Sequence, residues 1–482
     1  MATPRAKTYA VGSGQPVYAG RFGPARAGFA LTLDELLFAG AVAVSPVAQL
    51  GLTLDHLAYG GAAQVSPLAT LGVTLGDAAW AGGALVPPPA TVAFVGDSNS
   101  SFTYNNSPLY WALAVNGGVL APIIGAGVSG NTIQDCLARI DNDWTNASPG
   151  IANPPEPLGW VFLGGLGTNN ARTAAMSGSD QTAFTSLVNK CKAGGKKVVI
   201  FSVPPLGGSE AAANANVHTY NDFYATLHDG VDVFYVDWAT TVRGDVDTYL
   251  PGGVHWGDAG ALQAGLDGGA GLATIFAPYG YTSPVDSAVG STTTQWHTNP
   301  QNAGTGGTNS TGGSGSLPNG YTLSDPLATG NVANTSIVAS GDSNPSPYVR
   351  ISPTAMAAGG RLRLTVAGGG RSVTASDPAV LDCVLEVRFN AVNTSKLTDV
   401  RTWFTNAGGG LMVSGGDPSA DLMLRLGVIT SLTKTTVLRA KWKRTSSNVC
   451  ASGGSIYFEI RALSSFSSSI GSIDVRCHTI KG

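Results

Sequence analysis

Between about residues 90 and 280, short apolar runs alternate with stretches of helical periodicity. The runs predict strands over 91–95, 119–125, 160–164, 197–203 and 231–236, and the intervening stretches predict helices near 108–115, 132–141, 180–192 and 213–227. Strands that alternate with helices favour an α/β fold, a parallel sheet with helices on both faces. Ligands bind such sheets at the carboxyl ends of the strands, so the chemistry is expected there.

The last third of the chain shows a different pattern, in which apolar and polar residues alternate with period two. Six such segments, separated by Gly/Ser/Asp clusters, lie at 361–368, 385–392, 422–429, 437–444, 456–463 and 473–480. They predict an antiparallel β-sandwich, jelly-roll-like, over 321–482. The preceding residues 283–320 include "QNAGTGGTNSTGGSGS" and predict a Gly/Thr/Ser-rich linker.

The N-terminal region contains a gap-free repeat of 21 residues. Its copies span 31–51, 52–72 and 73–93, with an aromatic residue in register at Phe38, Tyr59 and Trp80. Units this short must bury their apolar faces against neighbours, so residues 1–90 are expected to form an elongated repeat stalk used for attachment. The Ala/Gly-rich repeat has too little apolar bulk to be stable as a single chain. We therefore expect a homo-oligomer, with a trimer as the first choice. Ala/Gly-rich low complexity is the alternative.

Composition narrows the classes of function. Charged residues make up 12% of the chain and the net charge is -3, which gives no reason to expect nucleic acid as a partner. We expect no membrane span and no secretory signal peptide, because apolar runs are interrupted by charge or proline. The five cysteines form no CxxC pair, so we expect neither a zinc site nor a disulfide framework, and no cofactor. The chain is expected to be made in a reducing cytoplasm.

Four polar clusters follow the predicted strands. They are "GDSNS" (96–100), "GAGVSGNT" (125–132), "GGLGTNN" (164–170) and "PGGVHWGDAG" (251–260). Each alone has an ordinary interpretation: Gly-Asp-Ser is usually a turn, and "SGNT" is a helix N-cap signal with Asn131 or Ser129 as the cap. Together, they fall in order at one edge of the predicted sheet.

In this order and placement the clusters resemble the four blocks of the SGNH hydrolase superfamily, also called GDSL esterases, from Val92 to about Ala277. The resemblance implies that Ser98 is the nucleophile and His255 the general base. It implies that the Gly130 backbone N–H and the Asn169 amide bind the oxyanion. It also implies a flavodoxin-like three-layer fold over 91–282 and hydrolysis of esters, often acetyl esters on sugars.

These residue types suit those roles. A serine hydroxyl is a weak nucleophile until a neighbouring base takes its proton, and imidazole titrates near working pH. Donors aimed at a developing oxyanion typically contribute about 3–4 kcal/mol each. A strand that ends in Gly-Asp-Ser is therefore better explained by a nucleophile at the strand tip than by a plain turn.

The sequence departs from the family pattern in three places. Gly252 stands where the family has an Asp three residues before the histidine, Asn170 replaces the Asp of the third block, and Trp256 replaces a common proline. An acid partner fixes the imidazole tautomer and stabilises the imidazolium. Without it, a backbone carbonyl in 250–253 accepts from the His255 ring, or a nearby acid takes that place (Asp245, Asp247 or Asp258), or the site is weakened or inactive.

The Gly/Thr-rich lead followed by a sandwich resembles carbohydrate-binding-like modules of bacteriophage tail proteins. The strand "RAKWKR" with Trp442 could meet an anionic glycan, although a solvated strand face is the simpler interpretation.

Two functions follow from this context. The first is a virion esterase, assembled in the infected cell, that deacetylates host surface polysaccharide and contacts other virion proteins through its N-terminal region. The second is a catalytically decayed scaffold in a fibre, spike or decoration subunit. A cellular esterase with a carbohydrate-binding domain is a third, which the lack of an export signal disfavours.

Overall fold

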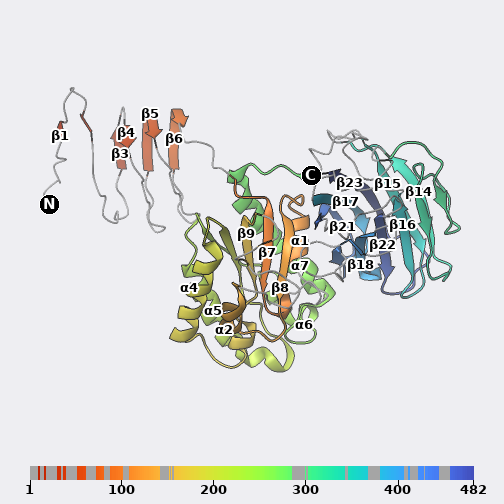
Figure 1. The fold of residues 1–482 in the computed structure, drawn as a ribbon, viewed down its shortest axis with the longest axis horizontal. Helices are drawn as coiled ribbons and strands as arrows, with labels where there is room; N and C mark the ends of the chain where they lie inside the picture. The colour runs from red at the N-terminus through yellow and green to blue at the C-terminus, as the bar shows by residue number, and fades with distance from the viewer. Residues whose placement is uncertain are drawn as a thin grey trace. The chain divides into compact units, whose positions relative to one another are not determined.

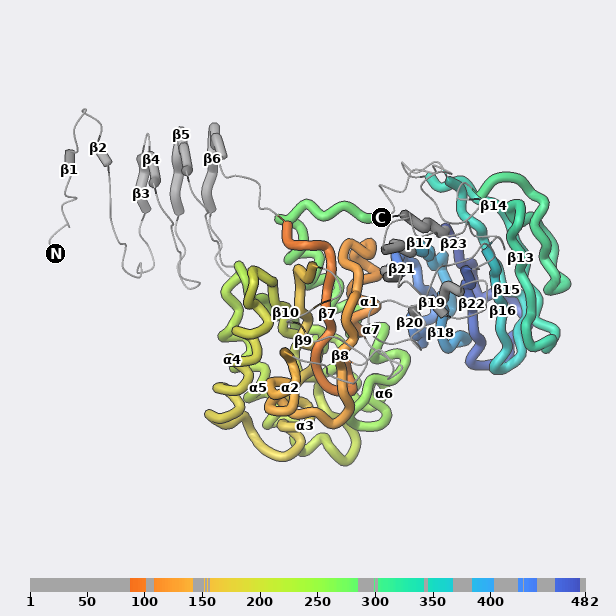
Figure 2. Tube along the Cα trace, viewed as in Figure 1, coloured from red at the N-terminus to blue at the C-terminus, as the bar shows by residue number. Residues whose placement is uncertain are grey.

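The structure is a computed structural model. It describes the backbone of residues 87–100, 108–141, 151, 154, 157–284, 299, 302–341, 346–366, 380–405, 411–412, 422–427, 429–443 and 456–481, and of six strands before residue 81. Side chains are described in these ranges except before residue 87 and at 380–383, 403–405, 411–412, 422–423, 440–443 and 477–481. The chain divides into two compact units, 1–86 and 87–482, and each is described by itself (Figures 1 and 2).

The middle of the chain forms the predicted parallel sheet. Its strands are β7 (Thr91–Gly96), β8 (Ala121–Gly127), β9 (Trp160–Gly164), β10 (Lys197–Phe201) and β11 (Val233–Val236). All neighbours pair in parallel, in the order β11-β10-β9-β7-β8. This is the flavodoxin-like order, in which successive connections leave the first strand on opposite sides. Ligands bind at that switch point, which here is the carboxyl end of β7.

Helices cover both faces of the sheet, as the three-layer prediction requires (Figure 1). One face carries α1 (Pro108–Ala114) and α7 (Asp258–Phe276), and the other carries α2 (Ile133–Arg139), α4 (Gly178–Lys192) and α5 (Asn214–Thr226). Alternate residues of each strand enter opposite cores: Val92 and Phe94 pack with α1 and α7, whereas Ala93 and Val95 pack with α2 and α4. The predicted α/β fold is confirmed.

The cap of α2 differs from the expected one. We expected Asn131 or Ser129, but Thr132 is the N-cap residue. Its hydroxyl accepts from the Asp135 backbone N–H, and the Asp135 carboxylate accepts from the Thr132 backbone N–H at 2.9 Å. Such a reciprocal capping box satisfies two helix-end donors at once, which a lone asparagine does not do. Asn131 lies one residue earlier and serves the neighbouring network described below.

The helix α7 was absent from the sequence prediction, and it is rich in glycine, which is a poor helix former. Its glycines stand where other chain segments approach closely. A Cβ on Gly265 would lie 2.1 Å from the Trp111 Cβ of α1, and one on Gly269 would lie 2.3 Å from a Val115 methyl group. The missing side chains therefore let α7 and α1 pack at short range, and tertiary contact outweighs propensity.

The C-terminal region is the predicted antiparallel sandwich. One sheet contains β12 (Thr308–Asn309), β13 (Thr322–Ser324), β16 (Arg361–Val366), β18 (Leu397–Thr405), β19 (Leu411–Met412), β20 (Leu422–Arg425) and β22 (Ile456–Ala462). The other contains β14 (Val332–Val338), β15 (Tyr348–Ala355), β17 (Val380–Val392), β21 (Leu432–Lys443) and β23 (Ser472–Lys481). All pairs are antiparallel except β12 with β13. Trp442 lies in β21, and its side chain is outside the described residues.

Residues 302–320, which we expected to belong to a loose linker, are part of the sandwich. The Thr308 N–H donates to the Tyr321 carbonyl at 2.9 Å, and Leu317 is fully buried. A Cβ on Gly315 would lie 1.7 Å from the Thr335 carbonyl oxygen, and one on Gly313 would lie 2.0 Å from that of Ala333. These glycines serve close backbone approach, whereas the linker interpretation took them as a sign of flexibility.

The sandwich and the α/β domain pack against each other within the second unit. The Trp111 indole N–H donates to the Arg425 carbonyl at 2.8 Å, and its ring lies 6.0 Å from that of Phe389. The Arg439 guanidinium donates to the carbonyls of Gly118 and Val119 at 3.1 and 3.0 Å. One hydrophobic core includes buried residues of both parts. The sandwich is therefore a structural neighbour of α1 and α7.

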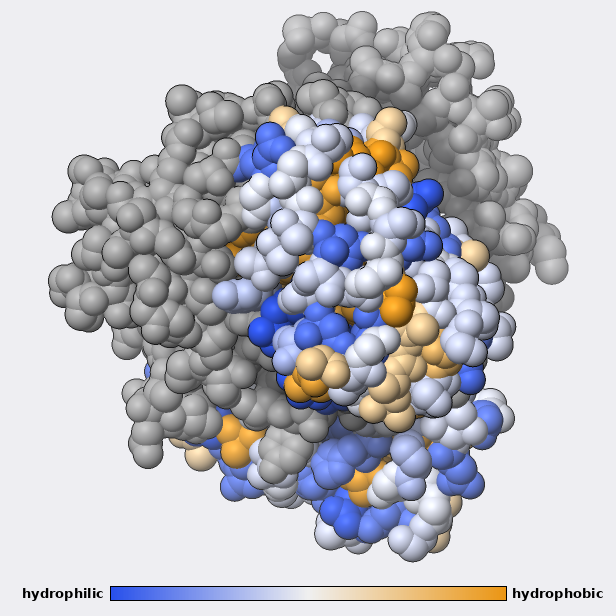
Figure 3. All heavy atoms as spheres, turned by 90° about the vertical axis from the view of Figure 1, so that its right-hand side faces the viewer, coloured by the Kyte–Doolittle hydropathy of each residue, from blue (hydrophilic) through white to orange (hydrophobic). Residues whose placement is uncertain are grey.

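Little apolar surface is exposed in the described residues. Among them, only Leu327 and Leu463 are large exposed hydrophobic residues. The described atoms in Figure 3 are mostly hydrophilic or neutral, and hydrophobic atoms form small separate groups. In the same part of the chain, no helix combines the length and apolar character that crossing a membrane requires.

The first unit contains parallel strands whose register follows the repeat. They are β3 (Ala30–Leu33), β4 (Leu36–Ala39), β5 (Gly51–Gly60) and β6 (Gly72–Trp80), after a short antiparallel pair, β1 (Tyr9–Ala10) and β2 (Pro16–Val17). Phe38 pairs with Tyr59, and Tyr59 with Trp80, so each pairing step equals the 21-residue period. The elongated stalk and its role in attachment stay predictions.

The close packing of α7 on α1 predicts that Gly265→Ala lowers the free energy of unfolding by about 1–3 kcal/mol, because the new methyl group meets Trp111 in a filled core. Gly178→Ala in α4 is the matched control, since a Cβ there has no neighbour within 4 Å. Urea unfolding followed by circular dichroism measures both. Equal stability of Gly265→Ala and the parent would contradict the packing described.

Candidate active site

The four polar clusters meet at the carboxyl end of the parallel sheet. Ser98 begins a short 3-10 turn, Ser98–Ser100, directly after β7. The last residue of β7, Gly96, must be small. A Cβ at this position would lie 2.4 Å from the Ser100 hydroxyl oxygen and 2.7 Å from the Gly164 carbonyl oxygen of β9. The Ser100 hydroxyl donates to that carbonyl. This close approach fixes the turn and places Ser98 at the switch point of the sheet.

His255 contacts Ser98 although the two residues are 157 positions apart in the sequence. Its Nε2 lies 2.9 Å from the Ser98 Oγ, within hydrogen-bond distance. Ser98 is 5% exposed, whereas His255 is exposed. In the tautomer with its proton on Nδ1, the ring accepts the serine proton at Nε2. The predicted pair is therefore in place for a proton transfer.

The loop that carries His255 is held by backbone bonds on both sides of the ring. The Gly207 N–H donates to the Gly253 carbonyl at 2.8 Å, and the Gly257 N–H donates to the Tyr249 carbonyl at 2.8 Å. The Asn99 side-chain amide also donates to the Val254 carbonyl at 3.3 Å. Asn99 follows Ser98, so this bond ties the segment of Ser98 to the loop of His255.

The two segments that carry the predicted oxyanion donors are joined by a hydrogen bond. Gly130 sits in the β8–α2 loop with a φ of 76°, a left-handed conformation that favours glycine. Asn169 lies in α3 (Thr168–Ala171), after β9, and its amide donates to the Asn131 carbonyl at 2.9 Å. This bond joins the loop of Gly130 to the helix of Asn169 on one side of the site.

Arg139, which sequence reasoning did not identify, links the end of β7 to this loop. Its guanidinium donates to the carbonyls of Gly96 and Ala126 at 3.1 and 3.2 Å, at the ends of β7 and β8. Its Nε donates to the Asn131 side chain at 2.6 Å. Burial lowers the pKa of this arginine. Its sequence signal, a single basic residue in the last turn of α2, is too common to be specific.

The departure at Asn170 has a structural counterpart. Its side-chain oxygen accepts from the Ile133 N–H at 3.0 Å, at the first turn of α2. Its amide donates to Gln134 at 3.1 Å and to the Asp180 carboxylate at 3.2 Å. An aspartate at 170 would bring a second negative charge to Asp180. The asparagine is therefore suited to its neighbours in this chain.

Gly252 and Asp247 are the two positions that the sequence suggested could orient the His255 ring. Gly252 is exposed, and a Cβ there has no atom within 4 Å. The Asp247 carboxylate accepts from the Gly208 N–H at 3.0 Å. Two carbonyls of the loop are engaged, since Leu250 accepts from Gly253 at 2.7 Å and Gly253 accepts from Gly207. The acceptor for the other ring nitrogen stays a prediction.

Asp258, another acid considered as a partner of the histidine, contacts the sandwich. Its carboxylate lies 3.8 Å from the Arg425 guanidinium, and burial raises its pKa.

Asp97, the residue before Ser98, is a fully buried acid to which sequence reasoning assigned no role. Burial raises its pKa to about 7, although a hydrogen bond from the Asn99 backbone N–H at 2.9 Å acts in the opposite direction. Burial raises the pKa values of Cys136 and Tyr224, and the Asp97 charge adds to both shifts. The acid therefore caps the turn that begins at Ser98 and titrates near neutral pH.

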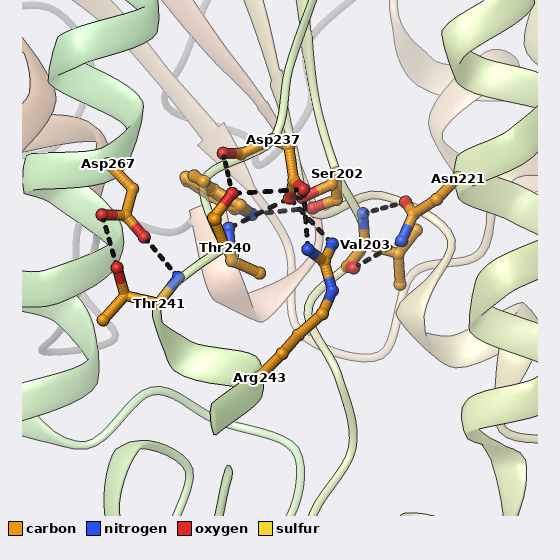
Figure 4. A network of polar contacts seen from close by, with 10 residues as sticks. Ser202, Val203, Asn221, Asp237, Thr240, Thr241, Arg243 and Asp267 are labelled. Carbon is orange, nitrogen blue, oxygen red and sulfur yellow. Dashed lines mark hydrogen bonds and ion pairs between the residues drawn. The ribbon is translucent and has the colours of Figure 1, made fainter. Parts of the chain in front are cut away.

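A polar network supports the segment that leads from β11 to His255 (Figure 4). Arg243 binds both oxygens of Asp237 at 2.7 and 2.8 Å, and the Ser202 hydroxyl donates to the same carboxylate at 2.8 Å. The Asp267 carboxylate of α7 accepts from the Thr241 N–H at 2.9 Å. The network fixes this connection to the ends of β10 and β11 and to α7.

With fold and geometry established, comparison with known proteins gives a family for this region. Residues 94–262 match the model of the GDSL-like lipase/acylhydrolase family. The chain therefore contains a GDSL/SGNH lipase–acylhydrolase domain. Among curated proteins, none matched the sequence.

Several solved structures are similar to parts of the chain. A carbohydrate esterase of family 3 from Talaromyces cellulolyticus shares 17% identity, with 39% of this chain and 98% of that one covered and a TM-score of 0.31. The psychrotrophic esterase EstA from Pseudoalteromonas sp. shares 16%, with 39% and 98% covered and a TM-score of 0.28. A structure described under carbohydrate-binding modules of the β-sandwich superfamily shares 10%, with 33% and 57% covered and a TM-score of 0.21.

The raised pKa of Asp97 predicts a pH dependence of stability. Below about pH 4 the Asp97 carboxyl is protonated in both the folded and the unfolded protein. Between about pH 4 and 7 it ionises only in the unfolded protein. Stability therefore falls as pH rises through this window, by on the order of 4 kcal/mol in all.

Asp97→Asn keeps the acceptor for the Asn99 N–H but cannot ionise. We expect it to be more stable than the parent at pH 8 and to lose this advantage towards pH 4, as measured by urea unfolding at each pH. Asp232→Asn, at an acid half exposed beside Lys197, is the control and should show no such trend. A constant difference between Asp97→Asn and parent across this range would contradict the assignment.

Proposed function

We propose that the domain is a serine esterase in which Ser98 is the nucleophile and His255 the general base. The contact of 2.9 Å between His255 Nε2 and Ser98 Oγ carries the proposal. The two residues are 157 positions apart and meet at the strand end where this fold binds ligands. The family match over residues 94–262 supports the same chemistry.

In this proposal His255 takes the proton of Ser98 as Oγ attacks the ester carbonyl carbon. The resulting oxyanion receives hydrogen bonds from the backbone N–H groups of Ser98 and Gly130 and from the Asn169 amide. The C–O bond of the ester breaks, and the leaving alcohol takes the proton from His255. Water then attacks the acyl-enzyme, gives its proton to His255, and the acid leaves as the proton returns to Ser98.

We further propose that the substrate is a small acyl ester, acetyl first, on a polysaccharide. His255 is exposed, so a bulky alcohol portion can remain in solvent while the carbonyl reaches Ser98. The chain as a whole would then be a virion subunit that deacetylates the host surface polysaccharide, with residues 1–90 as the attachment part and a homotrimer as the assembly. The repeat register and the sandwich in the same chain support this arrangement.

The second candidate is a scaffold whose catalysis has decayed. One observation favours it: Gly252 provides no carboxylate for the His255 ring. A neutral acceptor can hold the tautomer, but it stabilises the imidazolium less than a carboxylate does. The esterase proposal therefore predicts a slow enzyme.

The first test compares the parent with Ser98→Ala on p-nitrophenyl acetate. We expect the parent to release p-nitrophenolate above the buffer rate and the variant to lose about 10⁴-fold in rate or fall to background, because the nucleophile and base act as a unit. Ser129→Ala, at an exposed hydroxyl in the loop that contains Gly130, is the control and should keep the parent rate. Equal hydrolysis by parent and Ser98→Ala would remove the catalytic assignment, and hydrolysis by neither on this ester or on acetylated glycans would favour the scaffold.

The second test adds the missing acid. At position 252 a Cβ would have no atom within 4 Å, and the backbone there is not left-handed. Gly252→Asp can therefore place a carboxylate in the loop before His255. We expect kcat to rise by about tenfold, part of the ~10⁴ that a triad acid contributes elsewhere. Gly253→Asp is the control, because Gly253 has a φ of 78° and its Cβ would lie 2.8 Å from the Gly207 carbonyl oxygen. It should lower stability and activity, and a rise in both variants would speak against a specific role of position 252.

A further inference from the structure

The outer face of the larger sandwich sheet carries a dense group of arginines. We call it the arginine face, and it comprises Arg361, Arg363, Arg401, Arg425 and Arg461 together with Asp399 and Glu459. Pairing places one row of Arg361, Arg461, Asp399 and Arg425 across β16, β22, β18 and β20, and a second row of Arg363, Glu459 and Arg401 beside it. Five guanidinium groups and two carboxylates leave a net charge of +3 here, in a chain whose net charge is -3.

The two carboxylates hold some of these arginines in place. Glu459 is 1% exposed and accepts two hydrogen bonds from Arg363, at 2.8 and 3.1 Å. Asp399 is fully buried and accepts two from Arg401, at 2.8 and 3.1 Å. The Arg401–Asp399 pair is bidentate, with one bond to each carboxylate oxygen, whereas both bonds from Arg363 go to the same oxygen of Glu459. Charge-assisted contacts of both kinds are strong and hold the guanidinium groups in place. Each buried acid is thus neutralised by one closely bound arginine, and the remaining cations are in excess.

Arg361 and Arg461 carry much of the excess charge. They are directly opposite each other on β16 and β22, and like charges in that position destabilise a sheet. Their guanidinium groups approach the carboxylates only to 3.8–3.9 Å, and among the described residues neither makes a side-chain hydrogen bond. The Arg361 Nε is buried without a partner. Desolvation and the neighbouring Arg401 lower the pKa of Arg461.

The arginine face is accessible and adjoins the helix that follows the proposed base. The side chains of Arg361, Arg363 and Arg461 are 33%, 28% and 27% exposed. Arg363 lies 5.5 Å above the ring of Tyr457, which adds an aromatic surface to the same face. At the other edge, Arg425 lies 3.8 Å from Asp258, the first residue of α7, three positions after His255.

We propose that the arginine face binds an acidic polysaccharide, with Arg361 and Arg461 receiving the carboxylate groups of its sugars. A carboxylate between these two arginines would relieve their repulsion and satisfy their donors, since the guanidinium fork matches carboxylate geometry. The proposal deepens the proposed function by naming an anionic class of substrate. It rests on the proposed function in one respect: that function explains why a glycan would be held beside the α/β domain.

The binding test uses the full chain with Ser98→Ala, so that no turnover is needed, and polygalacturonate and dextran as probes in affinity electrophoresis. We expect retardation by polygalacturonate but not by dextran, and a loss of retardation at high salt. Adding Arg361→Gln and Arg461→Gln should weaken polygalacturonate binding by about tenfold or more, as expected for two lost charge-assisted contacts. Arg363 and Arg401 remain on the buried acids, so unfolding temperature should change little.

The control carries Lys192→Gln and Lys434→Gln in the same Ser98→Ala chain. These changes remove two positive charges from α4 and β21, so polygalacturonate binding should stay within about twofold of that of Ser98→Ala alone. Equal weakening by both double variants would overturn the proposal, as would equal retardation by dextran. Single-stranded DNA that binds as tightly through the same two arginines would also overturn it in favour of a general polyanion site.

The same variants separate this proposal from the esterase assignment. Arg361→Gln and Arg461→Gln in the parent should leave hydrolysis of p-nitrophenyl acetate unchanged and slow the deacetylation of acetylated polygalacturonate. A parent that binds polygalacturonate through these arginines but hydrolyses neither ester contradicts the esterase only. A parent that hydrolyses p-nitrophenyl acetate but binds polygalacturonate no better than dextran contradicts the arginine face only.

Discussion

The contact between Ser98 and His255 is the constraint on which the rest of the domain depends. A serine becomes nucleophilic only with a base within hydrogen-bond distance, and these residues are 157 positions apart. The chain must therefore build a sheet whose first strand ends just before Ser98 and a connection that returns to the same edge after the last strand. The strand order β8-β7-β9-β10-β11 provides the first condition, because β7 lies at the switch point.

The second condition is met by a series of short polar contacts. Asp237, Arg243 and Ser202 fix the segment after β11, and backbone bonds from Gly207 and Gly257 hold the loop of His255. Arg139 performs the same task on the opposite side, where it binds the ends of β7 and β8 and the Asn131 side chain. These contacts hold the segments that carry the buried Ser98 and the exposed His255, so that the two side chains meet.

The strongest sequence signals concerned this α/β domain. Strands such as Trp160–Gly164 and helices such as α2 and α5 follow from periodicity, which reports the two faces of an element directly. Ser98 and His255 were proposed from cluster order, and the structure brings the two side chains into contact. The polar connectors were missed because a single Arg139 or Asn99 has no pattern along the chain. Their partners, the Gly96 carbonyl and the Val254 carbonyl, are brought close only by the fold.

Two glycine-rich segments differ from the sequence prediction for the same physical reason. No helix was predicted over α7, and residues 302–320 were interpreted as part of a loose linker. Gly265 and Gly315 instead lie where a Cβ would collide with Trp111 or with the Thr335 backbone. The absence of a side chain is a local property, whereas the neighbour that requires it is distant in sequence. The arginine face is similar, since its rows appear only when β16, β22 and β18 are paired.

The central claim is that the fold makes Ser98 a nucleophile through His255. Incubation with diethyl p-nitrophenyl phosphate, followed by intact-mass and peptide mass spectrometry, tests it without assuming any natural substrate. The claim predicts one diethylphosphoryl group per chain, located on Ser98, and little labelling of the His255→Ala variant over the same time. A parent chain that stays unlabelled, or that is labelled at another residue at the same rate with and without His255, would contradict it.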